Sequence, residues 1–117
     1  MKIQVRNTTR DVVLADAASV ADSSQSRRTG LLKQTSLAPG DGLWIVPCES
    51  VHSFFMKFTI DVLYLDRQHK VKKVRPEMIP WRASACLTAH SVLELPAGTI
   101  ARTGTEVGDQ LEIKTLS

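Results

Sequence analysis

Long hydrophobic runs are missing from this 117-residue sequence. No apolar run exceeds four residues, the length of Leu43–Val46 and Val62–Leu65, whereas a membrane-spanning helix needs about 18 or more. The N-terminal segment has no apolar stretch after Lys2, so it lacks the pattern of a secretory signal. The sequence therefore predicts no membrane segment.

Cysteine and aromatic residues are also scarce. The chain has two cysteines, Cys48 and Cys86, and six aromatic residues. Two cysteines without an export signal are typical of the reducing cytoplasm, where thiols stay free. We expect a cytoplasmic protein, with a Cys48–Cys86 disulfide as the open alternative.

Charge of either sign is moderate. Fifteen basic and 12 acidic residues give a net charge of +3, which is compatible with an anionic partner but does not indicate one. The apolar fraction of 43% and the charged fraction of 23% are ordinary for a globular protein. At this length the chain can bury a real core, so residues 1–117 are expected to form a single domain.

Alternation of apolar and polar residues predicts a structure made mostly of strands. Two of these strands flank the turn at 7–10 and form an N-terminal hairpin, and two flank the polar turn at 66–69 and form a second hairpin. The predicted strands are Lys2–Arg6, Asp11–Ala15, Leu43–Val46, Ile60–Leu65, Lys70–Arg75, Ser91–Pro96 and Leu111–Lys114.

Two short helices complete the prediction. Asp22 is a candidate N-cap with Gln25 three residues on, ahead of a helix over 26–33 that either accommodates Gly30 or ends there. A second short helix is expected over 97–104, and the prolines at both ends of 76–80 favour irregular structure there. The fold class is therefore α+β: a compact single domain with a mostly antiparallel sheet, or a partly closed barrel, and about two short helices.

The stretch from Cys48 to Asp66 combines chemically capable side chains with the strongest strand pattern in the chain. If the protein has a binding site, this stretch is where we expect it. The candidate ligand-binding residues are Cys48, His52, Phe54, Lys57 and Asp61. For Lys57 and Asp61 a structural role stays open, because Lys57 can lay its stem over an aromatic ring and Asp61 can accept backbone N–H bonds at a turn.

Several short segments, taken in order, resemble one family of proteins. They are Gly30-Leu31-Leu32, Gly42-Leu43-Trp44-Ile45, Ser53–Lys57 followed by Ile60–Asp66, Leu93–Gly98 and Val107-Gly108-Asp109. This ordered set, over about residues 27–113, resembles the bacterial and archaeal domain of unknown function 192 family. The Pro47-Cys48…Val51-His52…Phe54 segment resembles one branch of that family, and Phe58 stands where the family more often has asparagine. The resemblance implies a small α+β fold and supplies no activity or catalytic residues.

Metal binding is a weaker hypothesis. Cys48 and His52 are four residues apart, as are Cys86 and His90, and four such ligands suit a structural zinc. Zinc modules usually space their cysteines more closely, so Cys86 and His90 are better explained as a small buried residue and a surface residue. We therefore predict no metal and no cofactor.

Nucleophilic catalysis is the alternative function. A hydrolase or transferase would use Cys48 activated by His52, which can meet if residues 48–52 form a helical turn. His52 and Ser53 point to opposite faces of an extended segment, and no G-x-S-x-G motif is present. A complete catalytic group is therefore not apparent.

A basic segment over residues 67–75 gives a second alternative. Its five cations can contact phosphates, although lysines on an edge strand more often discourage aggregation. Nucleic acid is therefore the less favoured partner. The leading hypothesis is a small binding or accessory module with a ligand- or peptide-recognition pocket around residues 48–61. Its partner is expected to be a small molecule or a protein, with no membrane association and no oligomeric state implied.

Overall fold

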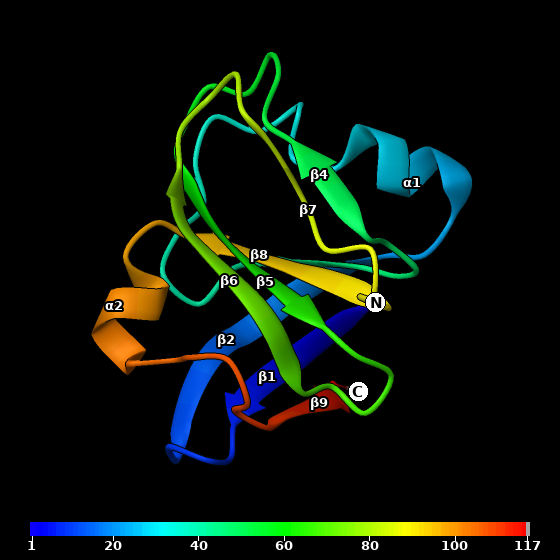
Figure 1. Cartoon of the computed structure of the whole chain (residues 1–117). Helices are drawn as coiled ribbons and strands as arrows, with labels where there is room; N and C mark the ends of the chain where they lie inside the picture. The colour runs from blue at the N-terminus through cyan, green and yellow to red at the C-terminus, as the bar shows by residue number, and fades with distance from the viewer. Residues whose placement is uncertain (117) are drawn as a thin grey trace.

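A computed structural model describes residues 1–116 of the chain. Two short helices and nine strands follow one another along it (Figure 1). In chain order they are β1 (Lys2–Asn7), β2 (Val12–Ala21), α1 (Ser24–Thr29), β3 (Leu43–Ile45), β4 (Ser50–His52), β5 (Ile60–Leu65), β6 (Val71–Met78), β7 (Ala83–Ala85), β8 (Ser91–Pro96), α2 (Thr99–Thr103) and β9 (Leu111–Thr115).

Seven of the strands form one sheet, in the order β6-β5-β8-β3-β2-β1-β9. All neighbours are antiparallel except β2 and β3, which run parallel. The sheet curls so that its two edge strands approach each other at one end, where Lys70 and Gln110 form a β-bridge and the Val71 amide donates to the Asp109 carbonyl at 2.9 Å. The fold is therefore a half-barrel, as the α+β prediction allowed.

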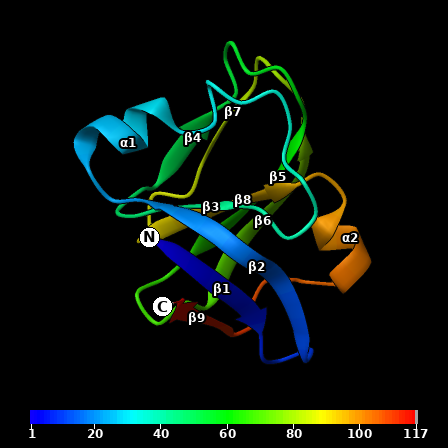
Figure 2. The ribbon, with the colours of Figure 1, turned by 180° about the vertical axis from the view of Figure 1, so that it is seen from behind.

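A separate ribbon of two antiparallel strands, β4 and β7, lies beside the sheet. In both views it stands next to α1, on the side of the molecule away from β1 and β9 (Figure 1, Figure 2). Both strands have three residues with an exposed–intermediate–exposed pattern. Because that pattern carries no apolar alternation, the sequence did not predict this ribbon.

Strands β5 and β8 divide the core in two. Their side chains alternate, so Leu63 and Leu93 enter one buried cluster while Val62 and Val92 enter the other. Every residue of β5 is buried, which explains why its sequence is nearly continuous in apolar residues. The second cluster lies under α1 and the β4–β7 ribbon, where the candidate site is found.

The first helix is shorter than predicted. It begins after Ser23, whose hydroxyl accepts from the Ser26 amide, so the N-cap is Ser23 rather than Asp22. It ends at Thr29, because Gly30 has a φ of 47° that helical residues do not adopt. Leu31, which the predicted helix over 26–33 included, is buried in the turn that follows.

The stretch predicted to be irregular at 76–80 belongs partly to a strand, since β6 runs through Pro76 to Met78. Proline is tolerated there because β6 is at the edge of the sheet. Both predicted hairpins and the strand and helix near 91–104 are present. Within residues 1–116, no helix has the length and apolar character needed to cross a membrane.

Candidate functional site

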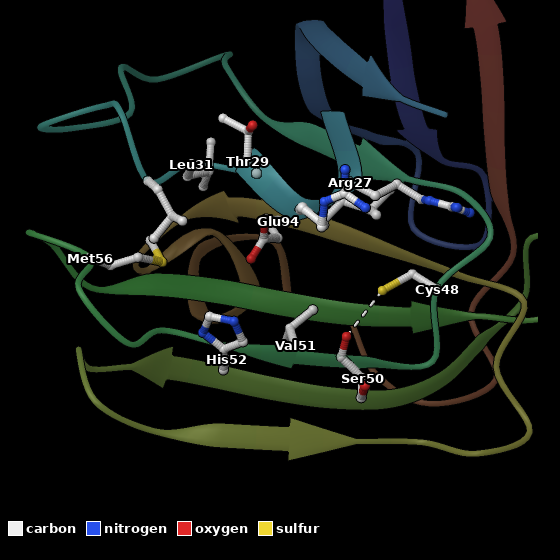
Figure 3. Close-up of a pocket in the computed structure, with 13 residues that line it drawn as sticks. Arg27, Thr29, Leu31, Cys48, Ser50, Val51, His52, Met56 and Glu94 are labelled. Atoms are coloured by element: carbon white, nitrogen blue, oxygen red, sulfur yellow. Dashed lines mark hydrogen bonds between the residues drawn. The ribbon is translucent and has the colours of Figure 1, made fainter. Parts of the chain in front are cut away.

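A cavity of about 350 Å³ opens between α1, the end of β3, strand β4 and the middle of β8 (Figure 3). Its wall combines apolar, sulfur-containing and charged groups. The apolar side is made by Leu31, Ile45 and Met56. Cavities of this size are typical of sites for small ligands.

Glu94 supplies the most unusual group in the wall. It lies on β8 between Leu43 of β3 and Val62 of β5, so it occupies a central position of the sheet. Its neighbours Leu93 and Leu95 belong to the first core cluster, and the Glu94 side chain projects from the other face. Only 4% of the residue is exposed, and its carboxyl makes no side-chain hydrogen bond or salt bridge within residues 1–116.

Burial changes the ionisation of this carboxyl. Removal from water raises the pKa of Glu94 from its usual value of 4.5 to about 7, because a low-dielectric environment disfavours the charged form. No nearby cation offsets this effect. Glu94 is therefore close to half protonated at neutral pH, and shifts of this kind are concentrated at functional sites.

Cys48 lies on the wall beside Glu94 (Figure 3). Its Sγ donates to the Ser50 carbonyl at 3.1 Å. Burial raises the pKa of the Cys48 thiol, and the charge of Glu94 adds to the rise. A nucleophilic cysteine needs the opposite shift, so this environment favours a neutral thiol.

His52 lies at the end of β4 and is exposed, with its side chain at the edge of the cavity. Its Nδ1 accepts from the Phe54 amide at 3.3 Å, and its ring stacks on Phe54 with centroids 4.9 Å apart. Residues 50–52 form a strand rather than a helical turn. Cys48 and His52 therefore share the cavity without the turn that the catalytic hypothesis required.

The other three predicted ligand residues do not line this cavity. Asp61 is fully buried, and its two oxygens accept from the Glu77 amide at 2.9 Å and the Ile100 amide at 2.7 Å. Lys57 is exposed, as is Phe54. Asp61 thus takes the structural role left open for it, and the structure does not bring Asp61 or Lys57 together with Cys48 and His52.

An exposed aromatic cluster stands next to the cavity. Phe54 stacks on Trp81 with centroids 5.8 Å apart, and Phe55 packs against the same ring at 4.7 Å. Phe55 and Trp81 both have positive φ values, 65° and 68°. Ser53 holds the two loops together, because its Oγ donates to the Ile79 carbonyl at 2.7 Å and accepts from the Arg82 amide at 2.9 Å.

Replacement of Ser53 by alanine is expected to loosen this cluster. The Ile79 carbonyl and the Arg82 amide would lose their partner, at a cost of about 1–3 kcal/mol in the free energy of unfolding. In a Trp44→Phe background, Trp81 fluorescence should shift to the red and be quenched more readily by acrylamide. Ser36→Ala is the matched control, because Ser36 is exposed and its hydroxyl makes no hydrogen bond within residues 1–116. Equal effects of the two substitutions would contradict the role given to Ser53.

The two Cys-x3-His pairs approach each other through their backbones. The Cys48 amide donates to the His90 carbonyl at 2.9 Å, and the Cys86 amide donates to the Glu49 carbonyl at 2.8 Å. Both cysteines are free, so the alternative disulfide is not formed. Among residues 1–116, no three His, Cys, Asp or Glu side chains are grouped so that they could hold a metal ion.

The basic segment at 67–75 is partly engaged within the fold. Lys73 donates to the Ala85 carbonyl at 2.7 Å and lies 5.6 Å from the centre of the Tyr64 ring. Arg75 donates to the Pro76 carbonyl at 3.4 Å. Lys73 thereby ties β6 to β7 and helps to hold the ribbon that carries His52.

Among the cavity residues that sequence reasoning missed are its three charged ones, namely Glu94, Arg27 and Arg28. One signal was available for Glu94: it is an acidic residue inside the otherwise apolar run Val92–Leu95. A charged side chain on a buried strand is rarely tolerated without a partner. The arginines gave no comparable signal, because basic residues are common in the last turn of a helix.

Comparison with known sequences gives one family. The family model DUF192, described as "Uncharacterized ACR, COG1430", matches residues 4–113. A UPF0127 protein of Thermococcus sibiricus is 30% identical over 115 residues, covering 91% of this chain and 71% of its own length. A UPF0127 protein of Pyrococcus abyssi is 32% identical over 113 residues, covering 91% of this chain and 93% of its own.

Two solved structures have the same fold. A candidate transcription regulator of Sinorhizobium meliloti 1021 superposes with a TM-score of 0.82 at 22% identity, covering 95% of this chain and 91% of its own. A protein of unknown function from Novosphingobium aromaticivorans also gives 0.82, at 20% identity, covering 96% of this chain and 84% of its own. At these identities the likeness concerns the fold alone. Assignment to the branch with the Pro47-Cys48 and Val51-His52 segment stays a prediction.

Proposed function

This chain belongs to the DUF192 family, and we propose that it is a binding module that holds a small polar ligand in the cavity bounded by Glu94, Cys48 and His52. The observation that carries the proposal is the buried Glu94 carboxyl, which has no partner within residues 1–116 and lies on the wall of a cavity of about 350 Å³. An unpaired ionisable group in such a place costs stability. A ligand that pairs with it recovers that cost, which is a physical reason for the group to be there.

The proposal keeps the binding module predicted from the sequence but changes which residues form its site. Cys48 and His52 remain part of the site, while Glu94 replaces Asp61 as its acidic group. We also propose a cytoplasmic location, which the two free cysteines support. Nucleic acid stays the less favoured partner, because Lys73 of the basic segment is already bound within the fold.

A thermal-shift screen tests this function. The wild type, Glu94→Gln and His52→Ala are compared against metal salts, nucleotides, small acids and small amines. At 100 times its Kd, a ligand stabilises its protein by about 2.7 kcal/mol, so the melting temperature of the wild type should rise by several degrees. The same compound should stabilise Glu94→Gln much less, and His52→Ala to an intermediate degree.

The control for this screen is Glu112→Gln, which changes an exposed carboxyl on β9. It should respond to the ligand as the wild type does. If every stabilising compound acts equally on Glu94→Gln, or if none stabilises the wild type, the proposed function is wrong.

A second function, an enzyme, has one observation in its favour. A general acid or base works best when its pKa is near the working pH, and burial places the pKa of Glu94 at about 7. Such an enzyme would use Glu94, rather than Cys48 and His52, to transfer a proton. Any ligand found in the screen should therefore be incubated with the protein and recovered; conversion by the wild type but not by Glu94→Gln would show turnover.

A further inference from the structure

Charged groups of opposite sign line the cavity at separate places. Glu94 comes from β8, and Arg27 comes from the last turn of α1 (Figure 3). Arg28, in the same helical turn, also lines the cavity. Apolar side chains, among them Leu31 and Met56, line another part of the wall (Figure 3). The cavity therefore presents an acidic group, basic groups and an apolar surface.

We propose that this cavity takes a small amine-bearing organic acid, with its ammonium group on the Glu94 carboxylate and its acid group at Arg27 and Arg28. This inference rests on the proposed function and names the chemical class of the ligand. The ligand bridges two charges that the protein keeps apart. Its carbon chain then contacts the apolar side chains of the wall.

The acidic end fits an ammonium group because Glu94 has both oxygens available. Cys48, on the same cavity wall, donates to the Ser50 carbonyl instead, and the Nδ1 of His52 accepts from the Phe54 amide. A buried carboxylate without a partner costs several kcal/mol. An ammonium group supplies both the opposite charge and hydrogen-bond donors, so it removes more of this cost than a neutral group can.

The basic end fits an acid group because the two guanidinium groups have no carboxylate partner within residues 1–116. Arg27 makes only long contacts, with the Pro47 carbonyl at 3.4 Å and the Ser24 hydroxyl at 3.5 Å. A guanidinium group binds carboxylate through two parallel hydrogen bonds. An acid group at the rim can therefore be held without breaking any strong contact in the protein.

The arginines do not neutralise Glu94 themselves. A guanidinium group in contact with the carboxyl would lower its pKa, whereas the pKa of Glu94 is raised, with burial as the cause. No salt bridge joins either arginine to Glu94 within residues 1–116, so the opposite charges are not paired with each other. A ligand with both groups on one short chain satisfies both ends, and a ligand with one group leaves one end unpaired.

Binding should release protons. The ionisable side chains that face Glu94 from the surrounding elements are Arg27 and Arg28 of α1, Cys48 before β4, His52 of β4 and Tyr64 of β5. With the pKa of Glu94 at about 7, about half of the molecules carry its proton at pH 7. An ammonium group requires the carboxylate, so about half a proton should leave per ligand bound, and affinity should rise from pH 6 to pH 8.

Three probes of matched length test the proposal by isothermal titration calorimetry. 6-Aminohexanoate carries both groups, hexylamine carries only the amine, and hexanoate carries only the acid. We expect 6-aminohexanoate, or another member of the series from 4-aminobutanoate to 8-aminooctanoate, to bind at least about tenfold more tightly than either single-ended probe. Titration in two buffers of different ionisation enthalpy measures the proton release.

Variants test which residues bind the ammonium group and which bind the acid group of the ligand. Glu94→Gln should abolish the proton release and the advantage of the amine, and the double variant Arg27→Gln, Arg28→Gln should reduce 6-aminohexanoate to the level of hexylamine. Thr29→Trp, which fills the cavity while keeping all three charged residues, should abolish binding. Arg102→Gln, on α2 and away from the cavity, should bind as the wild type does.

Other results would contradict the proposed ligand class, the proposed function, or both. If hexanoate binds as tightly as 6-aminohexanoate, or if no member of the series binds, the proposal is overturned. Should the thermal-shift screen meanwhile yield a neutral or purely acidic ligand that depends on Glu94, the proposed binding function stands and only the ligand class is wrong. If neither experiment finds a ligand that depends on Glu94, both are wrong.

Discussion

The stability of the Glu94→Gln protein relative to the wild type is expected to increase as the pH rises from 5 to 8. The pKa of Glu94 is about 7 in the folded protein against 4.5 when it is solvated. Between these values the unfolded chain has lost its proton while the folded protein keeps it. The folded state therefore binds more protons, and the free energy of unfolding of the wild type falls as the pH rises through this window.

The size of this effect follows from the shift. One pKa unit corresponds to 1.36 kcal/mol, so the stability difference between Glu94→Gln and the wild type should increase by about 2–3 kcal/mol from pH 5 to pH 8. Urea unfolding of both proteins at several pH values measures it. Burial of the glutamine amide also changes the free energy of unfolding, but by the same amount at every pH. The change in the stability difference between pH 5 and pH 8 is therefore independent of it.

Glu112→Gln serves as the control, since Glu112 is exposed on β9, and its stability should follow that of the wild type with pH. Parallel curves for Glu94→Gln and the wild type would show that the Glu94 carboxyl is solvated or paired in solution. That result would remove the main support for the proposed function.

Replacing Asp61 by alanine is expected to destabilise the protein by about 3–5 kcal/mol. The Asp61 carboxylate accepts the Glu77 amide at 2.9 Å and the Ile100 amide at 2.7 Å. It thereby fixes the end of β6, where Glu77 has a φ of 48°, and supplies a partner for a free amide at the start of α2. Without it, two amides lose their acceptor and a cavity is left in the core.

Asp61→Asn is the matched variant, because its amide keeps one acceptor oxygen and should lose about half as much stability. Urea unfolding at pH 7 compares the two. Since Asp61 projects from β5 on the face opposite Val62, the folded Asp61→Asn protein should keep the wild-type affinity for any cavity ligand. A loss of less than about 1 kcal/mol in Asp61→Ala, together with a loss of ligand affinity, would restore Asp61 as a binding residue.

Most of the sheet could be predicted because its strands carry a clear pattern. Ile3 and Val5 alternate with polar residues in β1, and β5 is apolar except for Asp61 because both of its faces are buried. The β4–β7 ribbon could not be predicted, since its strands have three residues each and only their middle residues are partly buried. These two strands form because they pair with each other although they are more than 30 residues apart in the sequence. A local sequence pattern cannot predict such long-range pairing.

The candidate site was predicted in part for the same reason. Cys48 and His52 were identified because they are chemically capable residues close together in the sequence. Glu94 is 46 residues beyond Cys48 and reaches the same cavity only because β8 lies between β3 and β5. Asp61 was included because it lies near Cys48 in the sequence, although the alternation of β5 directs it to the other face.

The sequence by itself determined the class of this protein: one small α+β domain, mostly antiparallel, without a long apolar helix. Local alternation and turn residues are sufficient to predict the fold class, because the apolar positions of each strand indicate which of its faces is buried. Only the tertiary structure decided which charged side chains are buried and what they face. Burial of Glu94 depends on the curl of the sheet and on α1 and β4 packing over it, and these long-range contacts made a carboxyl on an ordinary strand into the central group of the site.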